Sequence, residues 1–427
     1  MSKAIRYRKR ILDTLLRDKL KEIGAVLIEG PKQCGKTTTA AQIAKSIVYM
    51  ADPAERENRL QLARLQPSIL LAEKPPLLID EWQIAPELWD AIRYEVDCRG
   101  KSGQFILTGS AVSANREKIF HSGTGRFARL QMRTMSLYES EDSCGAVSIS
   151  DLFDGHFEAG KNLLTYERVA FLSCRGGWPA TLGKPDRAAL EHIFDYYSAI
   201  VSTDISRASN SRRNSETTKQ LMRSLARNQG SSISLADISK DISSNREIEA
   251  QNPEIISAYL DDLRKIFVIE DLPAWNPNLR SKTAIRSKAT RYFSDPSYFA
   301  AALGLGPMDL MKNPETFGFV FEALAIRDLR IYGDFNKASV YHYRDKSGLE
   351  CDAVMHRRDG QYGLIEIKLG GDEAIEHGAK TLKKLSQKID TSRMPSPAFL
   401  MVLTAVGSYA FRREDGVYVV PIGCLKN

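Results

Sequence analysis

The 427-residue sequence has no long apolar stretch, and no run in it approaches the ~18–20 apolar residues that a membrane-spanning helix needs. Its first residues are charged and lack the apolar core of a secretory signal. None of its six cysteines forms a C-x-x-C pair, so neither a zinc site nor a disulfide framework is indicated. We therefore expect reduced thiols and a cytoplasmic protein that makes no contact with a membrane.

Charge of one sign does not dominate either, with 60 Lys and Arg against 53 Asp and Glu and a formal net charge of +7. This excess permits contact with nucleic acid but does not demand it, because local clusters matter more than the total. The content of 43% hydrophobic and 26% charged residues is typical of a globular protein. The length exceeds what one hydrophobic core supports, so we expect two to four domains.

A phosphate-binding pattern, Gly-x-x-x-x-Gly-Lys-Thr, occupies residues 30–37. The apolar run 25–28 before it predicts a buried strand, and residues 38–46 after it predict a helix. In this order of elements, backbone N–H groups can face phosphate oxygens, although a chance match in a glycine-containing turn is the alternative. Lys36 would reach the β- and γ-phosphates of ATP, and Thr37 would bind Mg²⁺. The predicted nucleotide-binding residues are Gly30, Pro31, Lys32, Gln33, Cys34, Gly35, Lys36, Thr37, Thr38 and Ser110.

Two later strands are predicted to complete this site. One apolar run ends in Asp80 and Glu81, where Asp80 can hold Mg²⁺ through water and Glu81 can polarise the attacking water. Two acids that merely cap a strand at the surface are the alternative. The run 104–109 ends beside Ser110, so Ser110 or the nearby Thr108 is expected to sense the γ-phosphate. The sequence therefore predicts a hydrolytic nucleotide site.

With these motifs the chain resembles the AAA-type P-loop ATPases, and among them a bacterial and archaeal group. The shared marks are a basic segment at residues 7–11, GPKQCGKTT, LLIDEWQ, LTGSA and the segment 122–126. The resemblance implies an arginine finger at Arg126, or alternatively at Arg129, donated to a neighbouring subunit. A finger in trans implies a homo-oligomer, whereas a plain surface arginine in a basic loop does not.

The middle of the chain, residues 146–285, is predicted to be mostly helical. Residues 231–272 are predicted to form two short helices and a strand at 266–270, in the order of a winged helix, with Asn252 as the N-cap of the second helix. Residues 272–294 contain no acid, so we expect this segment to contact DNA phosphates. A purely structural winged helix is the alternative. The basic residues of the segment are Arg280, Lys282, Arg286, Lys288 and Arg291.

A second set of charged residues lies near the C-terminal end of the sequence. If two of the strands predicted there pair as a hairpin, Asp352, Glu366 and Lys368 converge, because alternate residues of a strand share a face. Two carboxylates form an oxygen site for Mg²⁺, and the lysine can orient or deprotonate the attacking water beside a phosphodiester. Two charged, solvent-facing strand edges are the alternative. Strands are predicted at 339–344, 349–355 and 362–369.

This arrangement resembles the restriction-endonuclease-like PD-(D/E)xK fold, in the DUF4143 form with which members of the same ATPase group commonly end. The resemblance implies that Glu322, on an apolar helix at 317–325, joins Asp352 and Glu366 as a metal ligand. Cys351 stands where the fold's name has proline, which leaves the acid in place. A fold that is present but catalytically idle is a further alternative, because function resides in sites rather than in folds.

The predicted fold class is α/β and multidomain: a P-loop parallel sheet in residues 1–145, a helical and winged-helix region in 146–285, and a restriction-endonuclease-like α/β domain in 286–427. The predicted function is Mg²⁺-dependent ATP hydrolysis coupled to a nuclease-like domain that binds or cleaves DNA. The alternatives are an ATP-switched DNA-binding regulator with an inert nuclease fold and a scaffold ATPase. The predicted catalytic residues are Glu81, Arg126, Asp352, Glu366 and Lys368, and the predicted metal ligands are Thr37, Asp80, Glu322, Asp352 and Glu366.

Overall fold

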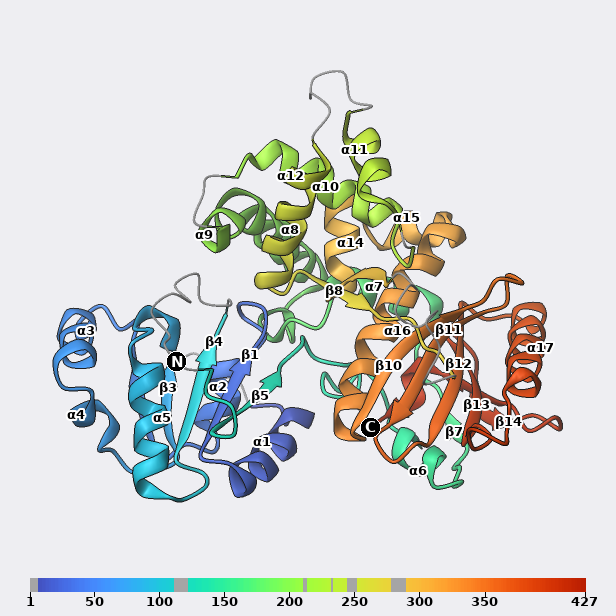
Figure 1. Ribbon diagram of the computed structural model, residues 1–427. Coiled ribbons are helices and arrows are strands. Elements are labelled where there is room, and N and C mark those ends of the chain that lie inside the picture. The colour runs from blue at the N-terminus through green and yellow to red at the C-terminus, as the bar shows by residue number, and fades with distance from the viewer. Residues whose placement is uncertain (1–6, 111–121, 210–212, 232, 244–251, 278–288) are drawn as a thin grey trace. The chain divides into compact units, whose positions relative to one another are not determined.

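The computed structural model describes residues 7–110, 122–209, 213–231, 233–243, 252–277 and 289–427 (Figure 1). The chain forms two compact units, and each unit contains segments that are far apart in the sequence. Among the described residues, no helix is both long and apolar enough to cross a bilayer. Unit 1 comprises residues 1–134, 203–213 and 262–267, and unit 2 comprises residues 135–202, 214–261 and 268–427.

Unit 1 is built on a five-stranded parallel sheet with the strand order β2-β3-β4-β1-β5. Strand β4 therefore lies between β1 and β3, although it follows both of them in the sequence. Because the carboxyl ends of parallel strands lie at one edge of a sheet, the last residues of β1, β3 and β4 lie at the same edge. The elements are α1 (Ile11–Glu22), β1 (Ala25–Glu29), α2 (Lys36–Ala41), β2 (Ser46–Tyr49), α3 (Arg56–Leu65), α4 (Pro67–Leu71), β3 (Leu77–Asp80), η1 (Trp82–Ile84), α5 (Leu88–Arg99), β4 (Phe105–Gly109) and β5 (Phe127–Gln131).

Helices cover both faces of this sheet. Along β1, Ala25 and Leu27 point to one face and Val26 and Ile28 to the other, because successive strand residues alternate. The first pair packs against buried residues of α3, α4 and α5, and the second pair against α1 and α2. Strand β1 is therefore apolar at its first four positions, as expected for a parallel strand that is covered on both sides.

The helix after the phosphate loop is shorter than the sequence predicts. Helix α2 ends at Ala41, and Ser46 begins strand β2 instead of ending a helix. Ile47 and Val48 are β-branched and pair in parallel with β3. The neighbouring strand therefore decides the conformation of this segment, and the local helical pattern was misleading.

Two short segments from the middle of the chain complete unit 1. Residues 203–213 contain α9 (Ile205–Ser209), and residues 262–267 contain the end of α12 (Pro253–Lys265). Nε of Arg213 donates to the carboxylate of Asp262 at 2.8 Å and joins the two segments. Both segments thus belong to unit 1 in the structure, whereas the division into three domains expected from the sequence places them in the middle region, residues 146–285.

Unit 2 contains a seven-stranded mixed sheet with the order β10-β11-β12-β13-β15-β14-β7. Strands β10, β11 and β12 are antiparallel neighbours, whereas β12, β13 and β15 run parallel. The hairpin predicted from the sequence is present, since Ala353 of β11 pairs with Ile365 of β12. The strands are β7 (Gly160–Lys161), β10 (Ala338–Arg344), β11 (Glu350–Arg357), β12 (Tyr362–Lys368), β13 (Phe399–Thr404), β14 (Tyr409–Arg412) and β15 (Tyr418–Pro421).

Helices α16 (Pro314–Phe335) and α17 (Asp372–Lys388) cover opposite faces of this sheet (Figure 1). On one face, a Cβ at Gly333 of α16 would lie 3.5 Å from Cε of Met355. On the other face, Val354 belongs to the apolar cluster that α17 forms with the sheet. Consecutive residues of β11 therefore pack against different helices, and the sheet is buried between them.

The helices of the middle region belong mostly to unit 2. Strands β8 and β9 pair antiparallel after α10, α11 and α12. The strand predicted at 266–270 begins only at Ile269, because α12 continues to Lys265. Arg280, Lys282, Arg286 and Lys288 lie outside the described residues, and the winged helix stays a prediction. The remaining elements are β6 (Val147–Ser148), α6 (Ile149–Phe153), α7 (Tyr166–Arg175), η3 (Pro179–Thr181), α8 (Asp186–Ala199), the π-helix η4 (Ile200–Asp204), α10 (Ser215–Arg227), α11 (Leu235–Ser243), α12 (Pro253–Lys265), β8 (Ile269–Leu272), β9 (Thr290–Phe293), α14 (Pro296–Leu303), α15 (Pro307–Lys312), η5 (Ile422–Cys424) and β16 (Leu425–Lys426).

Candidate functional site

The loop between β1 and α2 wraps around the side chain of Lys36. A Cβ at Gly30 would lie 2.1 Å from the carbonyl oxygen of Met132, so only glycine fits at this position. Gly35 has a left-handed φ of 105° and leads directly into α2. The ammonium group of Lys36 donates to the carbonyl oxygens of Gly30 (2.9 Å) and Pro31 (2.7 Å). The lysine that is expected to hold phosphate is therefore buried within its own loop.

The other predicted loop residues differ in their surroundings. Cys34 is buried, whereas Gln33 is exposed and has a positive φ of 61°. Thr38 is exposed in the first turn of α2. Lys32 forms an ion pair with Asp204, the last residue of η4. One loop residue thus contacts a segment that the sequence did not connect with the nucleotide site.

Asp80 joins the phosphate loop to the ends of two strands. Its Oδ1 accepts hydrogen bonds from the hydroxyl groups of Thr37 (2.5 Å) and Thr108 (2.6 Å). The strand order explains this contact, because β4 carries Thr108 and lies between β1 and β3. A hydroxyl and a carboxylate side by side are oxygen donors of the kind that Mg²⁺ prefers. The residues present therefore fit the metal ion that accompanies ATP.

Glu81 follows β3 with a left-handed φ of 56°, which costs a non-glycine residue about 1–3 kcal/mol. Its carboxylate accepts a hydrogen bond from the side chain of Gln83 and another from the hydroxyl group of Ser110 at 3.3 Å. The residues predicted to activate water and to sense phosphate therefore contact each other. Strained backbone at such a position is typical of functional sites, where the surrounding structure holds one side chain in place.

Arg10 supports the phosphate loop, a role that its place in the basic N-terminal segment did not indicate. Its guanidinium group donates from Nη1 to the carbonyl oxygen of Cys34 and from Nη2 to that of Arg133, both at 2.8 Å. The amide of Arg10 donates to Asp13 at 3.1 Å, so the start of α1 fixes the arginine. The acid three residues after Arg10 is a sequence signal for this helix start.

The predicted arginine finger lies away from the phosphate loop of its own chain. The carbonyl oxygen of Arg126 accepts a hydrogen bond from the amide of Ala25, at the start of β1, whereas the loop follows the other end of β1. Nε of Arg126 donates to Asp97 at 2.8 Å. Arg129, the alternative, pairs with Glu29 at 3.0 Å. Action of either arginine on a neighbouring subunit stays a prediction.

The hairpin β11–β12 brings three predicted residues of the C-terminal region together. The ammonium group of Lys368 lies 2.6 Å from Glu366 and 3.0 Å from Asp352. Asp352 also accepts a hydrogen bond from the amide of Ile367 at 2.7 Å. The contact follows from the register, because the pairing of residues 353 and 365 places the adjacent residues 352 and 366 side by side. We call Asp352, Glu366, Lys368 and Glu322 the acidic cluster.

The acids of this cluster are held in a poorly solvated place. Burial, and then the charge of Asp352, raises the pKa of Glu322 to about 8, and the same two causes raise the pKa of Glu366 to about 8. Burial favours the neutral amine of Lys368, but the charges of Asp352 and Glu366 outweigh it and raise the pKa of this lysine. The hydroxyl group of Tyr292 in β9 donates to Glu322, a contact that the sequence did not indicate. The cluster therefore places three carboxyl groups around one ammonium group, that of Lys368.

A metal ion would have to compete with Lys368 in this cluster. In the part of the chain that the structure describes, no set of three or more His, Cys, Asp or Glu side chains is arranged to hold a metal. The ammonium group of Lys368 contacts both Asp352 and Glu366, whose oxygens are suitable donors for Mg²⁺. Because each carboxylate has two oxygens, a cation that binds both acids would share them with the lysine.

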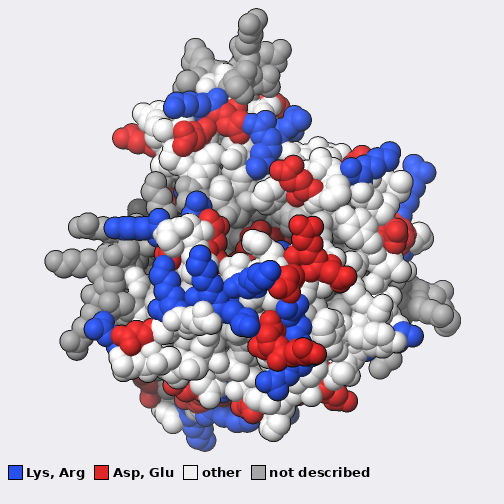
Figure 2. Space-filling view, turned by 90° about the vertical axis from the view of Figure 1, so that its right-hand side faces the viewer, with Lys and Arg blue, Asp and Glu red and all other residues white. Residues whose placement is uncertain are grey.

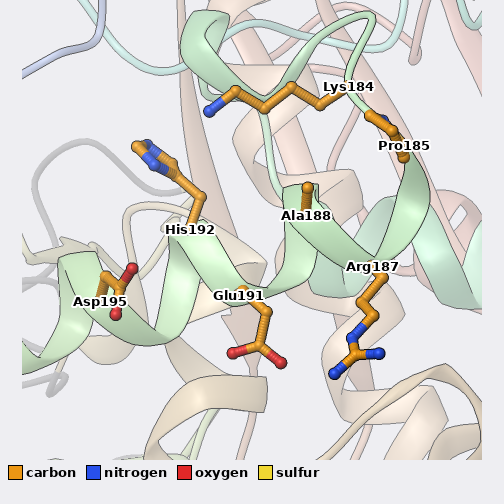
Figure 3. Close-up of a pocket in the computed structure, with 7 residues that line it drawn as sticks. All are labelled: Lys184, Pro185, Arg187, Ala188, Glu191, His192 and Asp195. Carbon is orange, nitrogen blue, oxygen red and sulfur yellow. The ribbon is translucent and has the colours of Figure 1, made fainter.

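A surface hollow of about 550 Å³ lies elsewhere, along α8 (Figure 3). Figure 3 shows His192 and Lys184 on one side of the helix and Glu191 and Arg187 on the other, so these side chains do not converge on one point. The hollow is thus an open helix surface and is separate from the phosphate loop and the acidic cluster. Its lining residues are Lys184, Pro185, Arg187, Ala188, Glu191, His192 and Asp195.

Three protein families match successive parts of the chain. Residues 23–141 match a family described as AAA domain, which covers the phosphate loop, Asp80 and Glu81. Residues 166–309 match the domain of unknown function DUF8612. Residues 317–425 match the domain of unknown function DUF4143, which covers the acidic cluster.

Relatives and solved structures resemble the chain at low identity. The uncharacterized proteins Rv2008c of Mycobacterium tuberculosis and Mb2031c of Mycobacterium bovis are each 23% identical over 416 residues, which is 95% of this chain and 82% of theirs. The structure of ORC2 from Aeropyrum pernix, in ADPNP and ADP complexes, is 13% identical and covers 64% of this chain and 90% of its own, with a TM-score of 0.32. The STAND protein PH0952 of Pyrococcus horikoshii is 13% identical over 78% of this chain and 50% of its own, with a TM-score of 0.26. Scores this low define no common fold for the whole chain.

Proposed function

We propose that this chain, an AAA-type P-loop ATPase with a C-terminal DUF4143 domain, binds ATP and Mg²⁺ at residues 30–37 and hydrolyses the nucleotide. The hydrogen bonds of Thr37 and Thr108 to Asp80 carry this proposal. They bring the phosphate loop and the ends of β3 and β4 together at one edge of a parallel sheet, where α/β proteins bind their ligands.

Nucleotide binding requires small movements of side chains that are already in place. Lys36 would exchange the carbonyl oxygens of Gly30 and Pro31 for oxygens of the β- and γ-phosphates. Thr37 and Asp80 would hold Mg²⁺, which supplies positive charge to the phosphate oxygens. The backbone N–H groups of the loop complete the contacts with the phosphates.

Hydrolysis requires a water molecule in line with the bond to the γ-phosphate. We propose that Glu81 orients this water and removes its proton. The contact between Glu81 and Ser110 keeps the base next to the residue that would contact the γ-phosphate. Arg126, which is remote from its own loop, is assigned to the loop of a neighbouring subunit. Its guanidinium would stabilise charge on the transferred phosphoryl group, and this role implies a homo-oligomer as the active form.

Replacing Lys36 by alanine is expected to weaken ATP binding about 100-fold or more, because two charge-assisted hydrogen bonds of about 1.5–3 kcal/mol each are lost. The measurement is titration of the full chain with ATP and Mg²⁺ by calorimetry. Lys45→Ala removes an exposed lysine of the same unit and is expected to bind as the wild type does. An affinity of Lys36→Ala within threefold of that of Lys45→Ala would overturn the assignment of the site.

For residues 286–427 we propose a restriction-endonuclease-like domain that acts on DNA. The contacts of Lys368 with Asp352 and Glu366 support this proposal, as does the position of Glu322 on the helix that packs against the same strands. Asp352 and Glu366 would hold Mg²⁺, which offsets charge on the phosphodiester, and Lys368 would orient the attacking water. The division into domains at residues 145 and 285 belongs to the same proposal.

Contact with DNA needs a basic surface near the acidic cluster. Figure 2 looks onto the side of the molecule that carries α17, and it shows Lys and Arg gathered on part of this face with Asp and Glu beside them. Helix α17 begins four residues after Lys368 and shows the same division, with acids in its first half and lysines in its second. We propose that these lysines, Lys380, Lys383, Lys384 and Lys388, contact the DNA backbone, which makes the binding sensitive to salt.

Replacing Asp352 by asparagine is expected to reduce Mg²⁺-dependent nicking of supercoiled DNA about 100-fold or more, because Asn supplies no negative charge to the metal or to Lys368. Asp359→Asn, which alters an exposed acid in the turn after β11, is the matched control and is expected to nick DNA at the wild-type rate. Nicking by wild type should also rise between pH 6.5 and pH 8.5, since Glu322 and Glu366, with pKa values raised to about 8, lose their protons in this range. Equal nicking by both variants, or activity that falls as the pH rises, would contradict the nuclease assignment.

A specific observation favours a second candidate function, that of an ATP-switched DNA-binding regulator with an inert nuclease fold. Lys368 forms ion pairs with both Asp352 and Glu366, and a cluster whose acids are paired with its own lysine can persist for structural reasons alone. In that case DNA binding would be salt-sensitive and would persist in Lys368→Ala without cleavage by any form of the protein. Nucleotide-dependent assembly with no affinity for DNA would instead indicate a scaffold ATPase.

A further inference from the structure

Lys32 in the phosphate loop forms an ion pair with Asp204, which lies 172 residues later in the chain. Both residues belong to unit 1, so the pair is internal to the ATPase unit. The carboxylate of Asp204 is mostly buried, with 13% of its side chain exposed, whereas the side chain of Lys32 is 40% exposed. A buried carboxylate is thus stabilised by a cation that solvent, and any ligand of the loop, can still reach.

The position of Lys32 in the loop places it next to the expected phosphates. The residue before it, Pro31, accepts a hydrogen bond from the ammonium group of Lys36 through its carbonyl oxygen. Lys36 is the group expected to reach the β- and γ-phosphates, so the backbone that carries Lys32 borders the space for the phosphate chain. The electrostatic field of bound phosphates therefore acts on the Lys32–Asp204 pair at short range.

The segment that carries Asp204 is built into the ATPase unit but is connected to unit 2 at both ends. Residues 203–213 pack with unit 1, while the chain on either side of them belongs to unit 2. Asp204 closes the π-helix η4, an irregular helix type that occurs frequently at functional sites. At the other end of the segment, Arg213 is held by Asp262. The contact with Lys32 is thus a direct connection between the phosphate loop and a segment that leads into the rest of the chain.

We propose that Lys32 and Asp204 distinguish ATP from ADP. The γ-phosphate of ATP binds the ammonium group of Lys32 and breaks its ion pair with Asp204, whereas the pair stays intact when ADP is bound. This inference rests on the proposed binding of ATP at the same loop. The triphosphate carries one more phosphate group than ADP at the end of the chain and competes more strongly for a cation at the edge of the loop. Loss of the pair leaves the Asp204 carboxylate without this cation and weakens the attachment of η4 and α9 to the loop.

The two variants Asp204→Asn and Lys32→Met separate this role from a structural one. In Asp204→Asn the side chain at position 204 has no negative charge and no longer competes with the γ-phosphate for Lys32. The affinity for a non-hydrolysable ATP analogue is therefore expected to rise about fivefold or more, while the affinity for ADP changes less than twofold. Lys32→Met is expected to weaken binding of the analogue by a similar factor, and adding Asp204→Asn to it should have no further effect. The measurement is titration of the full chain with each nucleotide by calorimetry.

A control variant and a hydrogen-exchange measurement complete the test. Lys21→Met removes one partner of an exposed ion pair in the same unit and is expected to leave both affinities unchanged. In wild type, backbone amides of residues 203–209 should exchange hydrogen faster with the ATP analogue than with ADP, and in Asp204→Asn they should exchange equally fast with both. The inference would be overturned if Asp204→Asn changed the affinities for both nucleotides equally. It would also be overturned if the wild-type exchange rates of residues 203–209 were the same with the ATP analogue and with ADP. Failure of wild type to bind any nucleotide would instead refute the proposed ATP site.

Discussion

Replacing Glu81 by glutamine is expected to lower the rate of ATP hydrolysis about 10²–10⁴-fold, because a positioned general base contributes a factor of this size. Glutamine has nearly the same shape and can keep the contacts with Gln83 and Ser110, but it cannot take a proton from water. ATP affinity is expected to stay close to that of wild type, since Lys36, Thr37 and Asp80 are unchanged. The variant should therefore hold ATP without hydrolysing it.

Steady-state phosphate release and calorimetric titration with ATP test this expectation together. Glu87→Gln is the matched control, because it makes the same change of an acid in the same unit, at the start of α5, where the residue pairs with Arg64 at 3.8 Å. It is expected to hydrolyse ATP at the wild-type rate. Turnover by Glu81→Gln within threefold of the control would show that another group activates the water. A joint loss of affinity and turnover would indicate that the strained turn at residue 81 had collapsed.

Replacing Arg327 by methionine is expected to destabilise unit 2 by about 3–5 kcal/mol, the usual effect of removing one partner from a buried charge network. The side chain of Arg327 is 1% exposed, and its guanidinium group lies 2.7 Å from Asp328 and 3.2 Å from Asp295, both fully buried. Methionine fills much of the same volume but removes the guanidinium group that both buried carboxylates contact. The acids also accept hydrogen bonds from the amides of Gly177 and Leu137, so this network joins α16 to earlier parts of the unit.

Urea unfolding followed by tryptophan fluorescence measures this loss, because the indole of Trp178 donates to Ser297 next to Asp295 and reports on the same region. Arg393→Met, which breaks an exposed pair with Asp390, is the control and is expected to change stability by about 0.5 kcal/mol or less. Adding Asp328→Asn to Arg327→Met should restore part of the loss, since one uncompensated charge disappears. A stability of Arg327→Met equal to that of the control would contradict this account of the network.

Features that depend on neighbouring residues could be predicted from the sequence. The phosphate loop is one stretch of eight residues between a strand and a helix, and its steric demand for glycine at position 30 is met in the structure. Alternation along two strands and a short turn between them was sufficient to predict that Asp352 and Lys368 would meet. The prediction of a helix at 38–46 was wrong beyond Ala41. Ser46 begins strand β2, which pairs with the parallel strand β3, and the local sequence pattern contains no sign of this pairing.

Contacts between distant segments could not be predicted. Tyr292 of β9 contacts Glu322 of helix α16, and Lys32 contacts Asp204 across 172 residues of sequence. No periodicity links such residues, since each contact depends on how whole elements pack. The pairing of Arg10 with the carbonyl oxygen of Cys34 is of the same kind, because it requires α1 to begin next to the phosphate loop.

The sequence by itself determined the chemistry of this protein: a phosphate loop with two acids on a later strand, and two acids with a lysine on a hairpin. Their side chains and spacing are local properties, and local geometry places them. The tertiary structure alone decided which other groups act on these sites. The strand order sets Thr108 beside Asp80, and packing brings Asp204 to Lys32. Burial, which no sequence pattern measures, raises the pKa values of Glu322 and Glu366 and so favours the neutral forms of these two acids.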